Sequence, residues 1–164
     1  MNLYLMRHAH ALDIGEGGIR RDFDRPLSGK GQDITREVAS ALKTIGIKLD
    51  FIGTSPLLRA RQTAEIVASE LGGIPVDRCP MMAPNGSFSE LIQWLRRCGF
   101  ESVMLVGHMP DLADLASTLI CGQTTAGLIF KKAAVCRIAF DTQPAAGKGA
   151  LEWLLPPAIM TRLD

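Results

Sequence analysis

Apolar residues along this chain follow two different periods, which divide most of it into short elements. Continuous apolar runs predict buried strands, and three such runs occur at residues 2–6, 50–54 and 102–107. Apolar residues spaced by three and four positions predict amphipathic helices, which begin near Ser28, Ser55, Ser87 and Pro110. Strands and helices therefore alternate through the first two thirds of the chain.

Capping residues and glycines set the expected ends of these helices. In the first helix, which Ser28 caps and Gly46 ends, four apolar residues share one face: Ile34, Val38, Leu42 and Ile45. The second helix follows Ser55-Pro56, which resembles a capping residue with proline at the first helical position.

The last part of the chain has a different pattern. Residues 134–140 and 150–155 predict two strands joined by a turn rich in Pro and Gly, which favours an antiparallel hairpin. The alternating elements before it predict a parallel core. We expect an α/β fold, a three-layer α/β/α sandwich whose mostly parallel sheet ends in an antiparallel C-terminal edge hairpin. We expect one domain over residues 1–164.

Composition excludes several classes of function. The formal charge of +1 and the lack of a strong basic run argue against a nucleic-acid partner, and no apolar run is long enough to span a membrane. Four cysteines are too widely spaced for a disulfide framework or a zinc cluster: Cys79, Cys98, Cys121 and Cys136. We therefore expect reduced thiols, a cytoplasmic location, and neither a metal nor a cofactor.

Cationic and imidazole side chains follow three of the predicted strands. Arg7 and His8 end the first strand, Arg59 comes shortly after the second, and His108 follows the run 102–107. Because parallel strands present their carboxyl ends at one edge of a sheet, these four side chains are expected to meet there. Such a group would be unstable through repulsion unless it held an anion, and a phosphoryl group matches guanidinium donors well.

The residue types then suggest roles. A neutral imidazole is a nucleophile, so His8, with its other ring nitrogen held by a backbone carbonyl, could attack phosphorus. Arg7, Arg59 and a protonated His108 would bind the phosphoryl oxygens as charge redistributes. Arginines supply the positive charge, so this chemistry needs no metal.

Four segments, in order, resemble a known family. Leu5-Met6-Arg7-His8-Ala9, the segment from Thr54 to Ala64, and Val106-Gly107-His108-Met109-Pro110 resemble the motifs of the histidine phosphatase (phosphoglycerate mutase-like) superfamily. Residues 25–31 resemble a segment of its short SixA-type phosphohistidine phosphatases. The resemblance implies that Arg7, His8, Arg59 and His108 form the phosphate pocket with His8 as nucleophile, and that Arg25 is a further phosphate or substrate contact.

The chain departs from the family pattern at two points. Ala9 stands where the signature usually has Gly, and no residue is a clear general acid. Glu90 is one candidate, although Ser87 to Glu90 is more typical of a capping box; Asp22 and Asp24, in a loop that we expect to be mobile, are others.

The lack of a clear general acid favours a substrate whose leaving group departs without being protonated by the enzyme. Phosphate monoesters benefit from an acid, whereas the ring of a phosphohistidine can be protonated by solvent before cleavage. The short chain also leaves little for a lid, so the site could admit a side chain of a partner, with the loop 11–26 beside it. We therefore predict a phosphohistidine phosphatase that acts on a phosphorylated protein such as a histidine-containing phosphotransfer domain or carrier. Two alternatives stay open: a broad phosphomonoesterase for small phosphorylated substrates, and a silent module that binds phosphorylated ligands.

Overall fold

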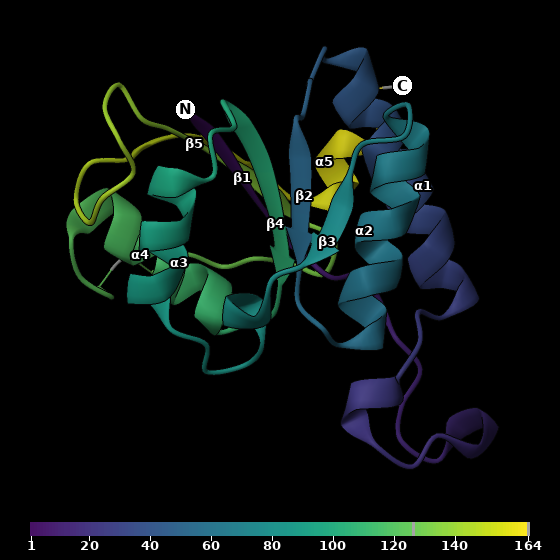
Figure 1. Cartoon of the computed structure of the whole chain (residues 1–164). Coiled ribbons are helices and arrows are strands. Elements are labelled where there is room, and N and C mark those ends of the chain that lie inside the picture. The colour runs from purple at the N-terminus through teal and green to yellow at the C-terminus, as the bar shows by residue number, and fades with distance from the viewer. Residues whose placement is uncertain (126, 164) are drawn as a thin grey trace.

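The structure is a computed structural model that describes residues 1–125 and 127–163. In these residues six strands form one sheet in the order β3-β2-β4-β1-β5-β6 (Figure 1). The strands are β1 (Asn2–Arg7), β2 (Phe51–Thr54), β3 (Val76–Arg78), β4 (Ser102–Gly107), β5 (Val135–Ala139) and β6 (Ala150–Leu155). The first four are parallel, β5 pairs antiparallel with both β1 and β6, and the predicted C-terminal hairpin is confirmed.

Helices cover both faces of the sheet. One face carries α1 (Gly29–Thr44), α2 (Leu58–Glu70) and α5 (Pro157–Met160), and the other carries α3 (Phe88–Arg97) and α4 (Asp111–Cys121) (Figure 1). Alternate residues of β1 enter the two cores, with Tyr4 and Met6 on one side and Leu3 and Leu5 on the other. The predicted three-layer α/β/α sandwich is therefore confirmed.

The first helix follows its expected face except at the end. Ser28 caps α1 by accepting a hydrogen bond from the Gly31 N–H, and Val38 and Leu42 are fully buried. Ile45 was expected in the core but is 41% exposed. It lies beyond the last helical residue, where the chain turns through Gly46 at a φ of 77°, and the turn directs Ile45 away from the sheet.

The expectation for the start of the second helix is wrong. The helix begins at Leu58 rather than directly after Ser55, and its capping position, Leu57, has no side-chain hydrogen bond. The Ser55 hydroxyl instead forms a hydrogen bond with His108, the residue that follows β4 (Ser102–Gly107). The sequence analysis also assigned no residues to β3 or α5, which are too short for their periodicity to be recognised.

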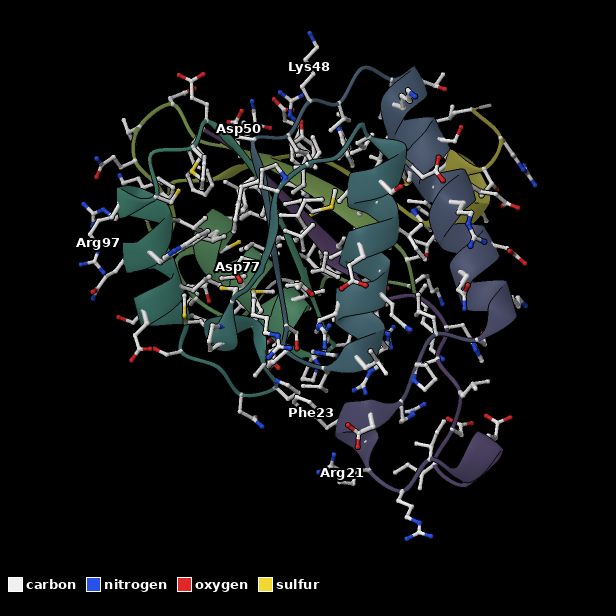
Figure 2. All side chains as sticks on the ribbon, turned by 45° about the vertical axis from the view of Figure 1, so that its right-hand side comes forward. Arg21, Phe23, Lys48, Asp50, Asp77 and Arg97 are labelled. Atoms are coloured by element: carbon white, nitrogen blue, oxygen red, sulfur yellow. The ribbon has the colours of Figure 1, made fainter. Side chains whose placement is uncertain are left out.

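Residues 11–26, called the lobe below, project from the sheet at the carboxyl ends of the parallel strands (Figure 1). The lobe holds two 3₁₀ turns, Glu16–Gly18 and Asp22–Asp24, and an Arg21–Asp24 ion pair of 2.6 Å. Figure 2 shows Arg21 and Phe23 at this end of the molecule, while Lys48 and Asp50 lie at the opposite end. The expected loop is therefore a structured extension beside the strand ends.

Candidate active site

Strand register places the ends of β2, β4 and β1 side by side. Arg7 is paired with Gly107 across β1 and β4, and Thr54 with Val106 across β2 and β4. The ladder continues for one more residue, because His8 N–H donates to the Gly107 carbonyl at 3.1 Å. His8 and His108 consequently face each other with ring centroids 5.0 Å apart.

His8 is held in the tautomer that a nucleophile needs. Its Nδ1 lies 2.7 Å from the Ala9 carbonyl oxygen, which can only accept, so Nδ1 carries the proton. Its Nε2 accepts from Arg59 Nε at 3.3 Å. Burial, together with the nearby His108, Arg59 and Arg7 charges, lowers the pKa of His8 to about 3 despite the Ala9 contact. The ring is therefore neutral at pH 7, and its unprotonated nitrogen, Nε2, carries the lone pair that accepts the Arg59 N–H.

Arg59 comes from the first turn of α2 and is only 6% exposed. Its Nε faces His8, while its two terminal nitrogens face the lobe. There Nη1 donates to the Asp22 carbonyl at 2.8 Å and Nη2 pairs with Asp22 Oδ2 at 3.0 Å. A cation near a helix N-terminus opposes the helix dipole, which is consistent with a functional rather than a stabilising role.

His108 shares a hydrogen bond with Ser55. The two atoms, His108 Nε2 and Ser55 Oγ, are 2.7 Å apart, and Ser55 Oγ also accepts from the Leu57 N–H at 3.4 Å. His108 Nδ1 is buried and has no hydrogen-bond partner within the part of the chain that the structure describes. Burial and the Arg59 charge lower the pKa of His108 to about 4, although Asp22 partly offsets them. This pKa favours a neutral ring at pH 7, where the sequence analysis expected a protonated one.

Arg7 completes the group from the last position of β1. Its Nη1 donates to the Phe130 carbonyl at 2.8 Å, whereas its Nε is buried and finds no hydrogen-bond partner among the residues described. Burial lowers the pKa of the guanidinium. The four residues predicted to form the phosphate pocket are thus close together, and their unused donors can bind an anion.

Backbone contacts around His8 explain two motif positions. The Ala9 N–H donates to Thr63 Oγ1 at 3.2 Å, and Thr63 Oγ1 donates to the Arg59 carbonyl at 2.8 Å, so one hydroxyl joins the segment that carries His8 to the segment that carries Arg59. A Cβ at Gly31 would clash with the His10 carbonyl, so only Gly allows α1 to pack this closely. Ala9 itself is fully buried in the core.

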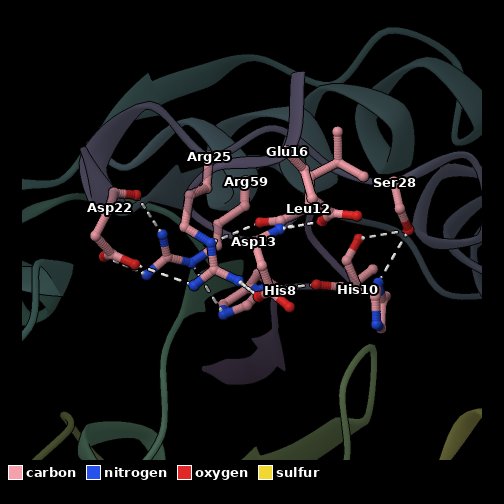
Figure 3. Close-up of polar contacts among 10 residues, drawn as sticks. His8, His10, Leu12, Asp13, Glu16, Asp22, Arg25, Ser28 and Arg59 are labelled. Carbon is pink, nitrogen blue, oxygen red and sulfur yellow. Dashed lines mark hydrogen bonds and ion pairs between the residues drawn. The ribbon is translucent and has the colours of Figure 1, made fainter. Parts of the chain in front are cut away.

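The remaining candidate residues lie outside the pocket. Arg25 lies in the lobe and contacts other lobe residues, donating to the Leu12 carbonyl at 2.6 Å and pairing with Asp13 and Asp22, and no polar contact among the described residues joins it directly to His8 (Figure 3). Glu90 is exposed on α3, where Ser87 caps its N–H at 3.2 Å. Sequence reasoning missed the contacts of Ser55 and Asp22, because both depend on where a loop or turn places a side chain.

Several other features of the described residues bear on the chemistry. In residues 1–125 and 127–163 no helix is long and apolar enough to cross a membrane. Within the same ranges no group of three or more His, Cys, Asp and Glu side chains is arranged to hold a metal. All four cysteines are free thiols.

Known proteins resemble this chain in sequence and in structure. Residues 3–83 match the histidine phosphatase superfamily (branch 1). An uncharacterized protein of Picosynechococcus sp. is 43% identical over 139 residues, which is 82% of each chain. Phosphohistidine phosphatase SixA of Escherichia coli is 30% identical over 163 residues, covering 96% of this chain and 94% of that protein.

The solved structures agree with this relationship. A structure of the protein histidine phosphatase SixA complexed with tungstate aligns with a TM-score of 0.84 at 28% identity, covering 98% of this chain and 99% of that one. The relatives and the site together support phosphatase activity. On its sequence, its fold and its catalytic geometry, the chain belongs to the histidine phosphatase superfamily.

Proposed function

We propose that this protein hydrolyses phosphohistidine in a partner protein through a covalent phosphohistidine intermediate on His8. One observation carries the covalent step. His8 directs the unprotonated Nε2 toward Arg59, while its Nδ1–H is bound to the Ala9 carbonyl. A buried, neutral imidazole beside cationic donors is suited to attack a phosphoryl group and to bear the phosphoryl afterwards.

The reaction proceeds in two displacements. In the first, His8 Nε2 attacks phosphorus, and the bond from phosphorus to the substrate's imidazole nitrogen breaks. In the second, water attacks the phosphorus of phospho-His8, the bond to Nε2 breaks, and inorganic phosphate leaves with the oxygen of that water. One proton of the water is released to solvent, and His8 returns to its neutral form.

Arg7, Arg59 and His108 stabilise the oxygens of the transferring group in both steps. In this proposal the Ser55 hydroxyl accepts from the Leu57 N–H and donates its own proton to His108 Nε2. His108 then carries its proton on Nδ1, the buried atom without a partner. A neutral His108 in this tautomer donates a hydrogen bond to a phosphoryl oxygen without needing a full charge.

The state of Asp22 supports an N–P substrate. Burial acts to raise the pKa of Asp22, but its hydrogen bonds to Arg25 and Arg59 outweigh this and lower it. The carboxyl group that contacts Arg59 is therefore ionised at neutral pH and is a poor proton donor. A phosphohistidine whose ring is already protonated at its other nitrogen leaves as neutral imidazole and needs no such donor.

A partner protein can reach the site from the lobe side. The lobe exposes Ile14 and Phe23, with relative exposures of 59% and 48%, next to Arg20 and Arg21. The related SixA proteins are described as phosphohistidine and protein histidine phosphatases. The free thiols fit the reducing cytoplasm as the setting.

The test compares wild type with His8→Ala on a phosphorylated histidine phosphotransfer domain, on a sugar phosphate and on a nucleotide phosphate. We expect His8→Ala to lower turnover by at least about 10³-fold while the circular dichroism spectrum stays unchanged. Brief incubation of wild type with radiolabelled phosphoprotein should give an acid-labile label on the enzyme. His10→Ala, which removes an exposed imidazole two residues away, should still take the label.

Each other outcome has a definite meaning. Full turnover by His8→Ala would rule out the covalent mechanism. A higher kcat/KM for the sugar or nucleotide phosphate would make the protein a phosphomonoesterase, and tight binding without turnover would make it a phosphate-binding module.

A further inference from the structure

Asp22 contacts the end of Arg59 that faces away from His8. The guanidinium presents its donors in one rigid plane. Nε donates to His8 Nε2 at 3.3 Å, while Nη1 and Nη2 bind the backbone carbonyl and the carboxylate of Asp22, at 2.8 and 3.0 Å. One residue thus supplies two acceptors to the two terminal nitrogens. This two-point contact fixes the rotation of the plane as well as its position.

We propose that Asp22 is a positioning residue, which fixes the Arg59 guanidinium so that its Nε edge faces His8 Nε2 and the phosphoryl group bound there. The inference rests on the proposed function, because it concerns the same transfer step. Asp22 touches neither the nucleophile nor the phosphoryl group, and it acts only through Arg59.

Freedom of rotation makes such a support necessary. An arginine side chain has several rotatable bonds, and phosphoryl transfer depends on donors that are already aligned when charge moves. Arg59 is held at its backbone by the Thr63 hydroxyl and at its tip by Asp22. Without the Asp22 carboxylate, one of the two contacts that define the plane is lost.

The lobe in turn holds Asp22. Its second carboxylate oxygen, Oδ1, pairs with Arg25 Nη1 at 3.1 Å, and Arg25 Nη2 pairs with Asp13 Oδ1 at 2.6 Å (Figure 3). Figure 3 shows the Arg25 and Arg59 guanidinium groups on the same side of Asp22. Arg25, expected from the sequence to contact phosphate or substrate, is therefore three contacts away from His8, with Asp22 and Arg59 between them.

Two other roles for Asp22 make different predictions. As a general acid, it would matter most for a poor leaving group and could not be replaced by an amide. As an anion that competes with phosphate for Arg59, it would inhibit, and its removal would raise both turnover and oxyanion affinity. A positioning residue is needed equally for all leaving groups, and an amide oxygen in the same place can partly replace it.

The experiment measures kcat and KM of wild type, Asp22→Ala, Asp22→Asn and Asp24→Ala with p-nitrophenyl phosphate and with phenyl phosphate, a poorer leaving group. Asp24 is the matched control, because it lies in the same 3₁₀ turn and pairs with Arg21. We expect Asp22→Ala to lower kcat about tenfold or more with both substrates, with KM within about twofold of wild type. Asp22→Asn should recover part of the loss, and Asp24→Ala should match wild type.

Three results would overturn the proposal. The first is unchanged turnover by Asp22→Ala. The second, expected of a general acid, is a loss of turnover with phenyl phosphate alone, in which Asp22→Asn is as impaired as Asp22→Ala. The third, expected of a competing anion, is faster turnover by Asp22→Ala together with tighter binding of tungstate.

A second measurement needs no substrate. In wild type, restricted rotation should give Arg59 two separate Nη signals in ¹⁵N NMR spectra, and Asp22→Ala should merge them while Asp24→Ala leaves them separate. Merged signals in wild type would contradict the positioning role even if catalysis were normal. Separate signals in a protein that hydrolyses no phosphate would refute the proposed function alone.

Discussion

Both ends of the sheet carry polar side chains, but among the described residues only the carboxyl end has buried side-chain nitrogens with neither a hydrogen bond nor an ion pair. At the amino end, Asp50 Oδ2 accepts from the N–H groups of Glu101 and Ser102, each at 2.9 Å, and Arg137 pairs with Glu152 at 2.8 Å. At the carboxyl end, Arg7 Nε and His108 Nδ1 are buried and have neither a hydrogen bond nor an ion pair with any residue in 1–125 or 127–163.

This difference distinguishes polar groups that stabilise the fold from polar groups that are available to bind a ligand. Buried polar groups are nearly always paired in folded proteins, so the amino end shows what a structural polar cluster of this chain looks like. The carboxyl end gathers two arginines and two histidines, of which only Arg59 pairs with a carboxylate, the half-exposed Asp22, among the described residues. Such a site favours an anionic ligand at the expense of stability. The comparison can be tested by changing each end separately.

The largest effect is expected for Arg7→Gln. This change removes Arg7 Nε, a buried donor with no hydrogen-bond partner among the described residues, which in the proposed function is aimed at a phosphoryl oxygen; it also removes the Nη1 contact with the Phe130 carbonyl. Loss of one such donor lowers turnover by about 10²–10³-fold in comparable sites. We expect this loss in kcat/KM with a melting temperature only about 2–4 °C below that of wild type, because one hydrogen bond to the Phe130 carbonyl is also lost; steady-state kinetics and calorimetry measure the two effects. A variant that melts much earlier but turns over normally would mean that Arg7 is structural.

The next largest effect concerns pH. Burial above all, with neighbouring positive charge, lowers the pKa of His8 to about 3 and that of His108 to about 4. Both pKa values rise to about 6.5 on unfolding, so the unfolded chain binds protons that the folded one does not. The free energy of unfolding should therefore fall as the pH drops from about 6.5 to 4, by up to about 1.4 kcal/mol per pH unit for each histidine.

Urea denaturation at several pH values measures this dependence. The variant with both His8→Gln and His108→Gln should show a flatter curve over the same range, because it lacks the two groups that take up protons on unfolding. Parallel curves for wild type and the double variant would show that the two imidazoles do not carry the effect.

The smallest effect is expected at the amino end. Asp50→Ala leaves the Glu101 and Ser102 N–H groups without their acceptor, which should destabilise the protein by about 1 kcal/mol. Since Asp50 lies at the other end of the sheet from the site (Figure 2), kcat/KM should stay within about twofold of wild type. A large loss of activity with little loss of stability would remove the distinction between the two ends.

Hydrophobic pattern was sufficient to predict most of this fold. The runs that precede Arg7 and His108 are strong strand signals, and Ser28 caps the first helix as expected. The four pocket residues could be predicted because parallel strands must end together. The parallel register of β1 and β4 then places Arg7 beside Gly107.

Contacts that depend on irregular backbone could not be predicted in this way. Ser55-Pro56 has the composition of a helix cap, yet α2 begins only at Leu58, and the hydroxyl instead bonds to His108. The contact between Asp22 and Arg59 spans 37 positions and is set by a 3₁₀ turn that has no hydrophobic period. No local pattern specifies such pairings, because they arise only once the lobe has packed against the strand ends.

The place of β5 beside β1 limits how far this protein could be shortened. All four pocket residues lie before position 110, but β5 pairs along one side of β1, and the Phe130 carbonyl holds Arg7. A fragment that stopped after α4 would keep every motif while exposing β1 as an unpaired edge, open to aggregation. The motif segments alone are therefore not expected to fold into the pocket. The C-terminal hairpin is needed as well, because β5 holds β1 in place.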